Sequence, residues 1–284
     1  MRDDQLRDLE RIWLETREPG ARKAWLHASA RAGQPWRFGS HVTRTPAGYE
    51  VLEAAEGASE HARPLVIVGP AGSGRTSLAR AIHEASHRAG GPFQTCDQLA
   101  DSLFEAELFG YLKTGWVERG GQQPGATETA KGGTLLITRI DPLPPIVQSK
   151  LRRCLEEGVS RRVGEREERV IDARFVFEVP DPDFLGSLWT SLDAVAAVTL
   201  SLPSLTDRRA DIPLILNGLD TEGLSLGSEV LELMGDHDWP GQVRELVMVV
   251  ERAKAHLEHE IPISGLPPAA FETRALELLT GLRP

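Results

Sequence analysis

The sequence predicts an α/β protein in which a parallel sheet flanked by helices is followed by a small all-helical part. An aliphatic, β-branched run, Leu65-Val66-Ile67-Val68, ends at a glycine-rich loop and is followed by a helical pattern. Similar alternation of buried strands and amphipathic helices continues to Pro213, after which only helical patterns occur. Alternating strands and helices imply a parallel sheet that is covered on both faces.

Each expected element rests on its hydrophobic period or on a boundary residue. A helix over 4–17 either packs on its own domain or docks another subunit, and two prolines make 33–48 a linker. The further expected strands are 134–137, 174–179 and 198–202, and the further helices are 76–88, 146–155, 228–235 and 241–258.

Composition narrows the class of protein. The formal charge of −10 over 284 residues argues against a wide nucleic-acid surface. Cys96 and Cys154 lack metal-ligand spacing, which favours reduced thiols in a cytosol. No run reaches the roughly 18 apolar residues of a membrane span, and the N-terminus has no signal-peptide core. We therefore expect a cytoplasmic protein that contacts no membrane.

A phosphate-binding loop stands between the first predicted strand and the next helix. Backbone N–H groups of glycine turns and a helix N-terminus suit phosphate oxygens, and Thr76 offers a hydroxyl of the kind that ligates magnesium. Arg75 occupies the position of the usual lysine, and its planar fork alters the phosphate geometry. The residues expected to bind nucleotide are Gly69, Pro70, Ala71, Gly72, Ser73, Gly74, Arg75, Thr76 and Ser77.

Four further motifs follow the loop along the chain. They are Glu107-Leu108-Phe109-Gly110, Gly132-Gly133-Thr134-Leu135, Leu202-Pro203-Ser204-Leu205 and Trp239-Pro240-Gly241-Gln242-Val243-Arg244-Glu245-Leu246. With these motifs, the chain from about Phe38 to Pro267 resembles the AAA+ domain of bacterial sigma-54-dependent transcriptional activators. The resemblance implies a P-loop NTPase with a helical lid, ATP or ADP as ligand, and Arg244 as a lid residue that contacts the nucleotide.

The resemblance also implies a division of the chain. An N-terminal helical extension is expected over 1–35 and the AAA+ α/β nucleotide-binding domain over 36–213. The helical lid is expected over 214–267 and a C-terminal tail over 268–284.

The departures from the family pattern fall on its chemistry. Thr138 and Arg139 stand where the family has the Asp-Glu pair that holds magnesium and polarises water. Pro180 replaces the sensing asparagine, and Trp189 and Val195 align with the arginine fingers. We therefore assign no catalytic residue and no metal ligand, and the resemblance gives no support for bound Mg²⁺.

The sigma-contacting loop of the family aligns with 114–119, where Trp116 is the one aromatic residue kept at the tip. We do not expect this loop to engage the sigma factor, and Trp116 is either a partner anchor or an idle or buried residue. Only about 17 residues follow Pro267, too few for a helix-turn-helix, so no direct DNA binding is expected.

Three other clusters receive weaker interpretations. His83-Glu84-Ala85-Ser86-His87 spells a zinc-protease motif with both histidines on one helix face, but we interpret them as solvated helix histidines. The charge run 165–169 is interpreted as a solvated hairpin loop, and Asp181-Pro182-Asp183 as a turn.

The leading hypothesis is a sigma-54-activator-like AAA+ protein that binds ATP but lacks hydrolysis, so it is not an enzyme. It would act as a regulatory or scaffolding subunit through protein contacts, with other AAA+ subunits or in a self-oligomer. The alternative is an active ATPase that regulates sigma-54-dependent transcription, with an acid supplied by Asp141 or by a neighbouring subunit. A third hypothesis is a switch that is gated by ATP binding without hydrolysis.

Overall fold

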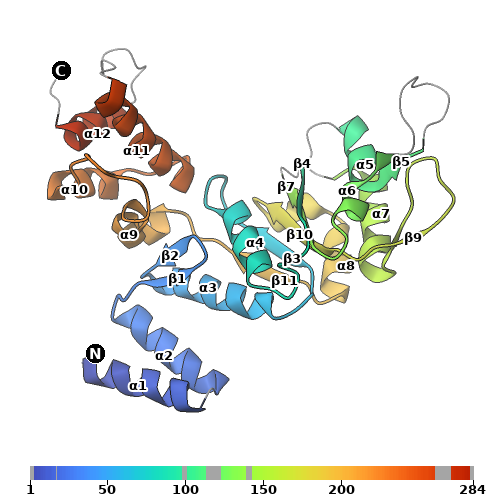
Figure 1. Ribbon diagram of the computed structural model, residues 1–284, viewed down its shortest axis with the longest axis horizontal. Helices are drawn as coiled ribbons and strands as arrows, with labels where there is room; N and C mark the ends of the chain where they lie inside the picture. The colour runs from blue at the N-terminus through green and yellow to red at the C-terminus, as the bar shows by residue number, and fades with distance from the viewer. Residues whose placement is uncertain are drawn as a thin grey trace. The chain divides into compact units, whose positions relative to one another are not determined.

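The computed structural model describes residues 3–16, 18–97, 101–112, 123–138, 143–259 and 270–281 (Figure 1). The chain forms two compact units. We call residues 53–69 and 75–202 the sheet unit, and residues 1–52, 70–74 and 203–284 the helical unit. Helix α3 (Pro46–Ser59) contributes residues to both.

A five-stranded parallel sheet forms the middle of the sheet unit (Figure 1). Its strand order is β11-β3-β10-β7-β4, and every neighbouring pair is parallel. The strands are β3 (Leu65–Val68), β4 (Phe93–Asp97), β7 (Thr134–Thr138), β10 (Arg174–Val179) and β11 (Val198–Ser201). The predicted fold class is confirmed. Strand β4 was not predicted, because Gln94, Thr95 and Asp97 hide its apolar pattern.

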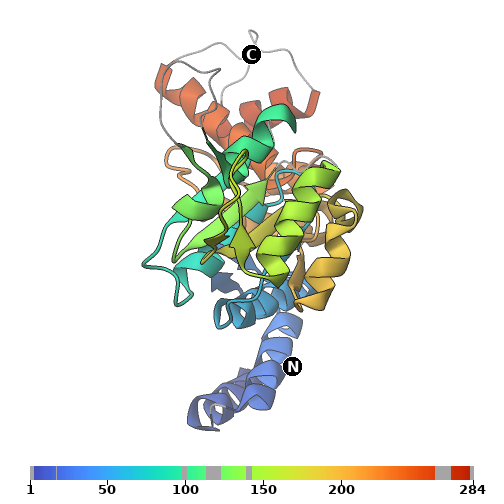
Figure 2. The ribbon, with the colours of Figure 1, turned by 90° about the vertical axis from the view of Figure 1, so that its right-hand side faces the viewer.

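The two faces of the sheet carry different residues, because side chains alternate along each strand. Phe175 and Phe177 of β10 belong to the large core that also contains buried residues of α5, α7 and α8. In Figure 2, α7 and α8, in yellow-green and gold, lie side by side over the sheet. The alternate β10 residues, including Val176 and Glu178, therefore lie on the other face, where α4 (Arg75–Glu84) contacts β3, β7 and β10.

The other elements of the sheet unit are short. Helices and 3₁₀ turns are α5 (Asp101–Phe109), α6 (Ala126–Thr129), α7 (Pro145–Glu156), η1 (Pro182–Leu185) and α8 (Leu188–Ala194). Two antiparallel ribbons pair β5 (Gly110–Tyr111) with β6 (Gln123–Pro124), and β8 (Val159–Ser160) with β9 (Arg169–Val170).

Both cysteines of the chain are buried in the sheet unit and neither forms a disulfide. Burial raises the pKa of the Cys96 thiol to about 12 and that of the Cys154 thiol to about 11. Both residues therefore behave as small core residues.

The N-terminal part of the helical unit is a helix pair followed by a hairpin. Helix α1 (Asp3–Thr16) contacts α2 (Pro19–Arg31), and the rings of Trp13 and Trp25 stack with their centroids 5.4 Å apart. Strands β1 (Trp36–Phe38) and β2 (His41–Thr43) then form an antiparallel hairpin. The predicted linker 33–48 is therefore wrong in part, because the turn at Gly39-Ser40 lets two short strands pair between its prolines.

The C-terminal part of the helical unit has its own apolar core. It contains η2 (Thr206–Asp211), α9 (Ile212–Leu216), α10 (Ser228–Asp236), α11 (Gln242–His259) and α12 (Ala270–Thr280). Trp239 is fully buried in this core and donates its indole N–H to the Met234 carbonyl at 2.8 Å. The buried Asp211 carboxylate accepts hydrogen bonds from Thr43 Oγ1 and Arg44 N, both at 2.7 Å, which joins η2 to the hairpin. The predicted all-helical character after Pro213 is confirmed among the described residues.

Among the residues that the structure describes, no helix is both long enough and apolar enough to span a membrane.

Candidate functional site

The predicted phosphate loop connects β3 to α4, and its glycines adopt conformations that favour glycine. The φ angles of Gly72 and Gly74 are +84° and +107°. Ser73 N donates to the Pro70 carbonyl at 3.2 Å, which closes a tight turn, and α4 begins directly afterwards at Arg75. Thr76 and Ser77 lie in the first turn of α4, where backbone N–H groups point out of the helix end and the helix dipole favours an anion.

Arg75 folds back over the start of its own loop. Its Nη1 donates to the Gly69 carbonyl at 2.7 Å, and its Nε lies 4.0 Å from a carboxylate oxygen of Glu178. The guanidinium is thus held beside the loop by a short bond to backbone and by a longer ion pair. Its positive charge therefore lies beside the loop, where it can pair with a phosphate.

The middle of the loop contacts residues of the helical unit, to which 70–74 belong. Arg244 N donates to the Gly72 carbonyl at 3.2 Å, and a Cβ at Gly72 would collide with the Gly241 carbonyl oxygen. The loop and Arg244, which were predicted together as nucleotide-binding residues, are therefore neighbours.

Two buried basic residues flank the same loop residues. Arg208 donates to the Ser73 carbonyl at 2.9 Å, and the buried His41 has a backbone hydrogen bond with Gly74. Burial, and next the charge of Arg208, lower the pKa of His41 to about 4, so the imidazole is neutral at pH 7. Ser73 Oγ is also buried and has no hydrogen-bond partner among the described residues.

Thr138 ends β7 at the position of the missing acid. Its hydroxyl donates to Asp97 Oδ1 at 2.6 Å, and the two residues are register partners on β7 and β4. Among the described residues, β7 therefore ends in Thr138 rather than in an acid. The Thr138 hydroxyl is engaged by Asp97 of β4, the strand on one side of β7.

Glu178, on the strand at the other side of β7, is the functional residue that sequence reasoning missed. It is a register partner of Ile67 on β3 and only 4% exposed, and its Oε2 accepts a hydrogen bond from Thr76 Oγ1 at 3.2 Å. The signal in the sequence was a lone acid within the apolar run 175–179. An inaccessible carboxylate is costly unless a partner or a ligand stabilises its charge, so this acid required an explanation.

Comparison with known proteins identifies the type of domain. A family model described as the sigma-54 interaction domain matches residues 42–181. The chain carries a sigma-54 interaction domain. The transcriptional activator RocR of Bacillus subtilis is 35% identical over 254 residues, which cover 82% of this chain and 54% of RocR. The transcriptional regulatory protein ZraR of Salmonella typhimurium is 31% identical over 288 residues, which cover 92% of this chain and 62% of ZraR.

Solved structures agree with this assignment. NtrX from Brucella abortus in complex with ATP is 25% identical and superposes with a TM-score of 0.66, covering 97% of this chain and 64% of that chain. Together with the sheet order and the C-terminal helices, these matches show an AAA+ P-loop NTPase fold. The chain spans little more than half of the length of several curated relatives, for example 54% of RocR.

The histidines of the zinc-protease pattern in this sigma-54 interaction domain do not share a helix face. Helix α4 ends at Glu84, because Ser86 N and Ser86 Oγ both donate to the His83 carbonyl and start a turn. His83 is buried, with its Nδ1 2.9 Å from Thr134 Oγ1, whereas His87 is exposed beyond the helix. The predicted helix 76–88 is therefore too long, and His83 is a core histidine rather than a solvated one.

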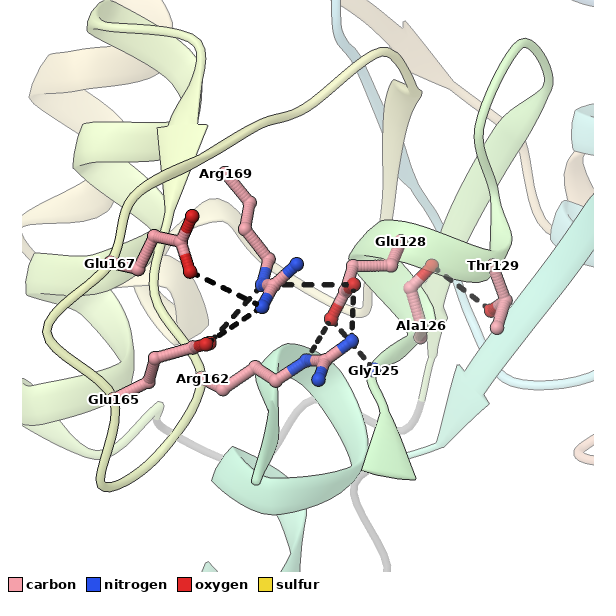
Figure 3. Close-up of polar contacts among 8 residues, drawn as sticks. All are labelled: Gly125, Ala126, Glu128, Thr129, Arg162, Glu165, Glu167 and Arg169. Atoms are coloured by element: carbon pink, nitrogen blue, oxygen red, sulfur yellow. Dashed lines mark hydrogen bonds and ion pairs between the residues drawn. The ribbon is translucent and has the colours of Figure 1, made fainter. Parts of the chain in front are cut away.

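The charge run 165–169 belongs to the β8–β9 hairpin, as predicted, and residues 166–168 are exposed, whereas Glu165 and Arg169 are only partly exposed. Figure 3 shows Arg162 paired with Glu128, and Arg169 bridging Glu128 and Glu165. Arg162 Nε and Nη2 donate to the two Glu128 oxygens, each at 2.7 Å, and Arg162 is buried. Glu128 lies in α6, so this network joins α6 to the β8–β9 hairpin.

The remaining sequence-predicted positions fall into two groups. Pro180 follows β10, Trp189 lies in α8, Val195 follows α8, and Asp181 accepts from Asp183 N at 2.9 Å in a turn, as predicted. Positions outside the described residues are Trp116 with the loop 114–119, Arg139 and Asp141.

The residues of the loop fit the phosphates of a nucleotide. Glycines at positive φ, the N-terminus of α4 and the Arg75 cation suit phosphate oxygens, and the buried Ser73 hydroxyl lacks a partner among the described residues. The oxygen donors of Thr76 and Glu178 fit a hard divalent cation, for which a hydroxyl, a carboxylate and phosphate are preferred ligands.

Proposed function

We propose that this protein is a nucleotide-binding AAA+ subunit of the sigma-54-activator type that binds ATP or ADP without hydrolysing ATP. It would act in the cytoplasm as a regulatory or scaffolding subunit, through contacts with other AAA+ subunits or with copies of itself. The observation that carries this proposal is the combination of a phosphate loop with glycines at positive φ and a strand, β7, that ends in Thr138 rather than in an acid.

Binding is supported by the conformation of the loop and by relatives. The loop presents glycines at positive φ, a helix N-terminus and Arg75, and NtrX was crystallised in complex with ATP. Residues 69–77 and Arg244 remain the proposed nucleotide contacts, and the boundaries 1–35, 36–213, 214–267 and 268–284 remain proposed domains.

Loss of hydrolysis is supported by the chemistry at the same edge of the sheet. Hydrolysis of a phosphoanhydride requires a group that orients the attacking water, and arginine fingers accelerate such reactions by roughly 10³–10⁵. Thr138 is engaged with Asp97, and the aligned finger positions hold Trp189 and Val195, which carry no positive charge.

Calorimetric titration with ADP and with a non-hydrolysable ATP analogue, together with an ATP turnover assay, tests the proposal. We expect binding of both nucleotides and no turnover above the no-protein background. Replacing Arg75 with alanine should weaken binding about 10- to 100-fold, because it removes one charge-assisted contact. Arg80→Ala, an exposed arginine of the same helix, is the matched control and should bind as the wild type does.

Two results would contradict the proposal in different ways. Absence of heat with either nucleotide would show that the loop is only a structural turn. Turnover that Arg75→Ala abolishes and Arg80→Ala leaves intact would show that the protein hydrolyses ATP.

The second candidate function is an active ATPase that regulates sigma-54-dependent transcription. It is favoured by one observation, the Glu178 carboxylate in contact with the Thr76 hydroxyl, which places an acid beside the loop by an unexpected route. Nucleotide-dependent opening of a promoter by sigma-54 polymerase discriminates the two functions. This candidate requires opening, and the proposed function predicts none.

A further inference from the structure

The strands on both sides of β7 carry carboxylates where β7 itself has none. β7 lies between β10 and β4 in the sheet. Asp97 of β4 is the register partner of Thr138 and accepts its hydroxyl. On β10, Phe177 is the partner of Ile137, so Glu178 lies one residue farther, level with Thr138. The acids at this edge of the sheet therefore lie on the two strands that neighbour β7 and not on β7 itself.

Of these two acids, Glu178 is the one for which the structure describes contacts with the phosphate loop. Its Oε2 lies 3.2 Å from Thr76 Oγ1 and 4.0 Å from Arg75 Nε, whereas the hydrogen bond described for the Asp97 carboxylate comes from Thr138. Glu178 also lies on the face of β10 that α4 covers, since its strand neighbours Phe177 and Val179 belong to the opposite core.

Packing gives no reason for an acid at position 178. Every residue of β10 is buried, and a carboxylate in such a strand carries a desolvation cost that an apolar residue of similar volume avoids. The contact described with Arg75 is a long one, at 4.0 Å, and the guanidinium makes its short bond to Gly69. A divalent cation would offset the desolvation cost directly.

The available donors match the way in which Mg²⁺ is bound beside nucleotides. Mg²⁺ usually takes one or two protein oxygens together with substrate phosphates and water, rather than a cage of protein ligands. Thr76 and Glu178 provide a hydroxyl and a carboxylate. Within the described residues there is no group of three or more His, Cys, Asp or Glu side chains that could hold a metal without a nucleotide.

We propose that Glu178 supplies, beside the Thr76 hydroxyl, the carboxylate that holds Mg²⁺ when a nucleoside di- or triphosphate occupies the loop. Glu178 thereby replaces the acid that is absent at Thr138. This inference rests on the proposed nucleotide binding and adds to it the metal and the residue that orders it. With its carboxylate committed to the metal, Glu178 is not available to polarise the attacking water, so the metal stabilises binding without restoring hydrolysis.

The test measures binding of a fluorescent ADP analogue to the full chain in Mg²⁺ and in EDTA. We expect the wild type to bind at least about tenfold more tightly in Mg²⁺, the usual size of effect for a group that organises a metal. Glu178→Gln should bind equally in both buffers. Asp97→Asn, the matched control on the other side of β7, should keep the Mg²⁺ enhancement.

A second readout follows the metal itself. With ADP, the wild type should remove the electron paramagnetic resonance signal of free Mn²⁺, and Glu178→Gln should leave it. Thr76→Ala changes the other donor at an exposed position of α4, so it should fold normally and also lose the enhancement. It keeps the test decisive if Glu178→Gln unfolds, which thermal unfolding followed by circular dichroism would show.

The possible results separate this inference from the proposed function. Wild-type binding that is equal in Mg²⁺ and EDTA, or an enhancement kept by Glu178→Gln, overturns the metal site and leaves nucleotide binding in place. Tighter binding by Glu178→Gln in both buffers also overturns it, because Glu178 then only competes with phosphate for Arg75. No binding in either buffer overturns both proposals.

Discussion

Two arginine–carboxylate pairs of the sheet unit, each with one buried member, have opposite geometries. Arg162 and Glu128 form two parallel hydrogen bonds, each 2.7 Å long. Arg75 and Glu178 approach only to 4.0 Å, and each makes a shorter hydrogen bond to another group.

The difference separates a structural pair from a pair that can exchange partners. In a bidentate pair, each group satisfies the other, so the geometry is fixed and losing one partner is costly. In the looser pair, Arg75 and Glu178 can each take a new partner, phosphate or metal, while keeping a bond to Gly69 or Thr76. The number of residues between the partners does not distinguish these two kinds of pair, but the geometry of their hydrogen bonds does.

The largest expected effect is on the coupling between Arg162 and Glu128. A double-mutant cycle with Arg162→Gln and Glu128→Gln should give a coupling free energy on the order of 2–3 kcal/mol in urea unfolding, because the two groups share two charge-assisted hydrogen bonds and Arg162 is buried. Arg161→Gln, an exposed neighbour, should give a far smaller change. A coupling near zero would remove the structural role assigned to this pair.

The pH dependence of stability provides a second test of the Arg162–Glu128 pair. The Arg162 hydrogen bond holds the pKa of Glu128 below its ordinary value of 4.5. The pair therefore contributes its full stability above about pH 4.5 and loses it as the pH falls through the lowered pKa of the folded state. The stability difference between the wild type and Glu128→Gln should shrink below that pH. A difference that stays constant to pH 3 would contradict this assignment.

A smaller coupling is expected for Arg75 and Glu178. The cycle with Arg75→Gln and Glu178→Gln should give about 1 kcal/mol or less, since the ions share no short hydrogen bond. Saturating ADP should lower this coupling further as both groups change partners. If the coupling equals that of Arg162 and Glu128, the comparison fails and Arg75 is a structural residue.

The smallest effect is expected at the surface. Arg153 and Glu157 form a short, exposed pair one helical turn apart, with nitrogen and oxygen 2.8 Å from each other. Glu157→Gln should leave the unfolding midpoint within experimental scatter, because solvent screens such pairs. A clear destabilisation would show that distance alone, without burial, decides the strength of these pairs.

Local patterns predicted most of the fold, whereas contacts between distant residues decided the rest. Aliphatic runs located β3, β7, β10 and β11, and the apolar period located α7, α10 and α11. The end of α4 was placed too late, since the turn depends on one hydroxyl, Ser86, bonding back to His83.

The candidate site was predicted only as far as its continuous motif. Residues 69–77 could be found because their spacing is local. Glu178 lies 102 positions from Thr76, and only the strand order brings the two together. Arg162 and Glu128 lie 34 positions apart and were missed for the same reason. A run of charged residues in the sequence does not reveal which of its side chains are buried.

The two cysteines make this chain convenient for site-directed labelling. Burial keeps Cys96 and Cys154 protonated, with pKa values of about 12 and about 11, so maleimides should react with neither in the folded protein at neutral pH. A single thiol introduced at an exposed position such as Met248 would then carry the only dye or spin label. Distance measurements between two thiols introduced in this way could follow nucleotide-dependent motion without a cysteine-free background.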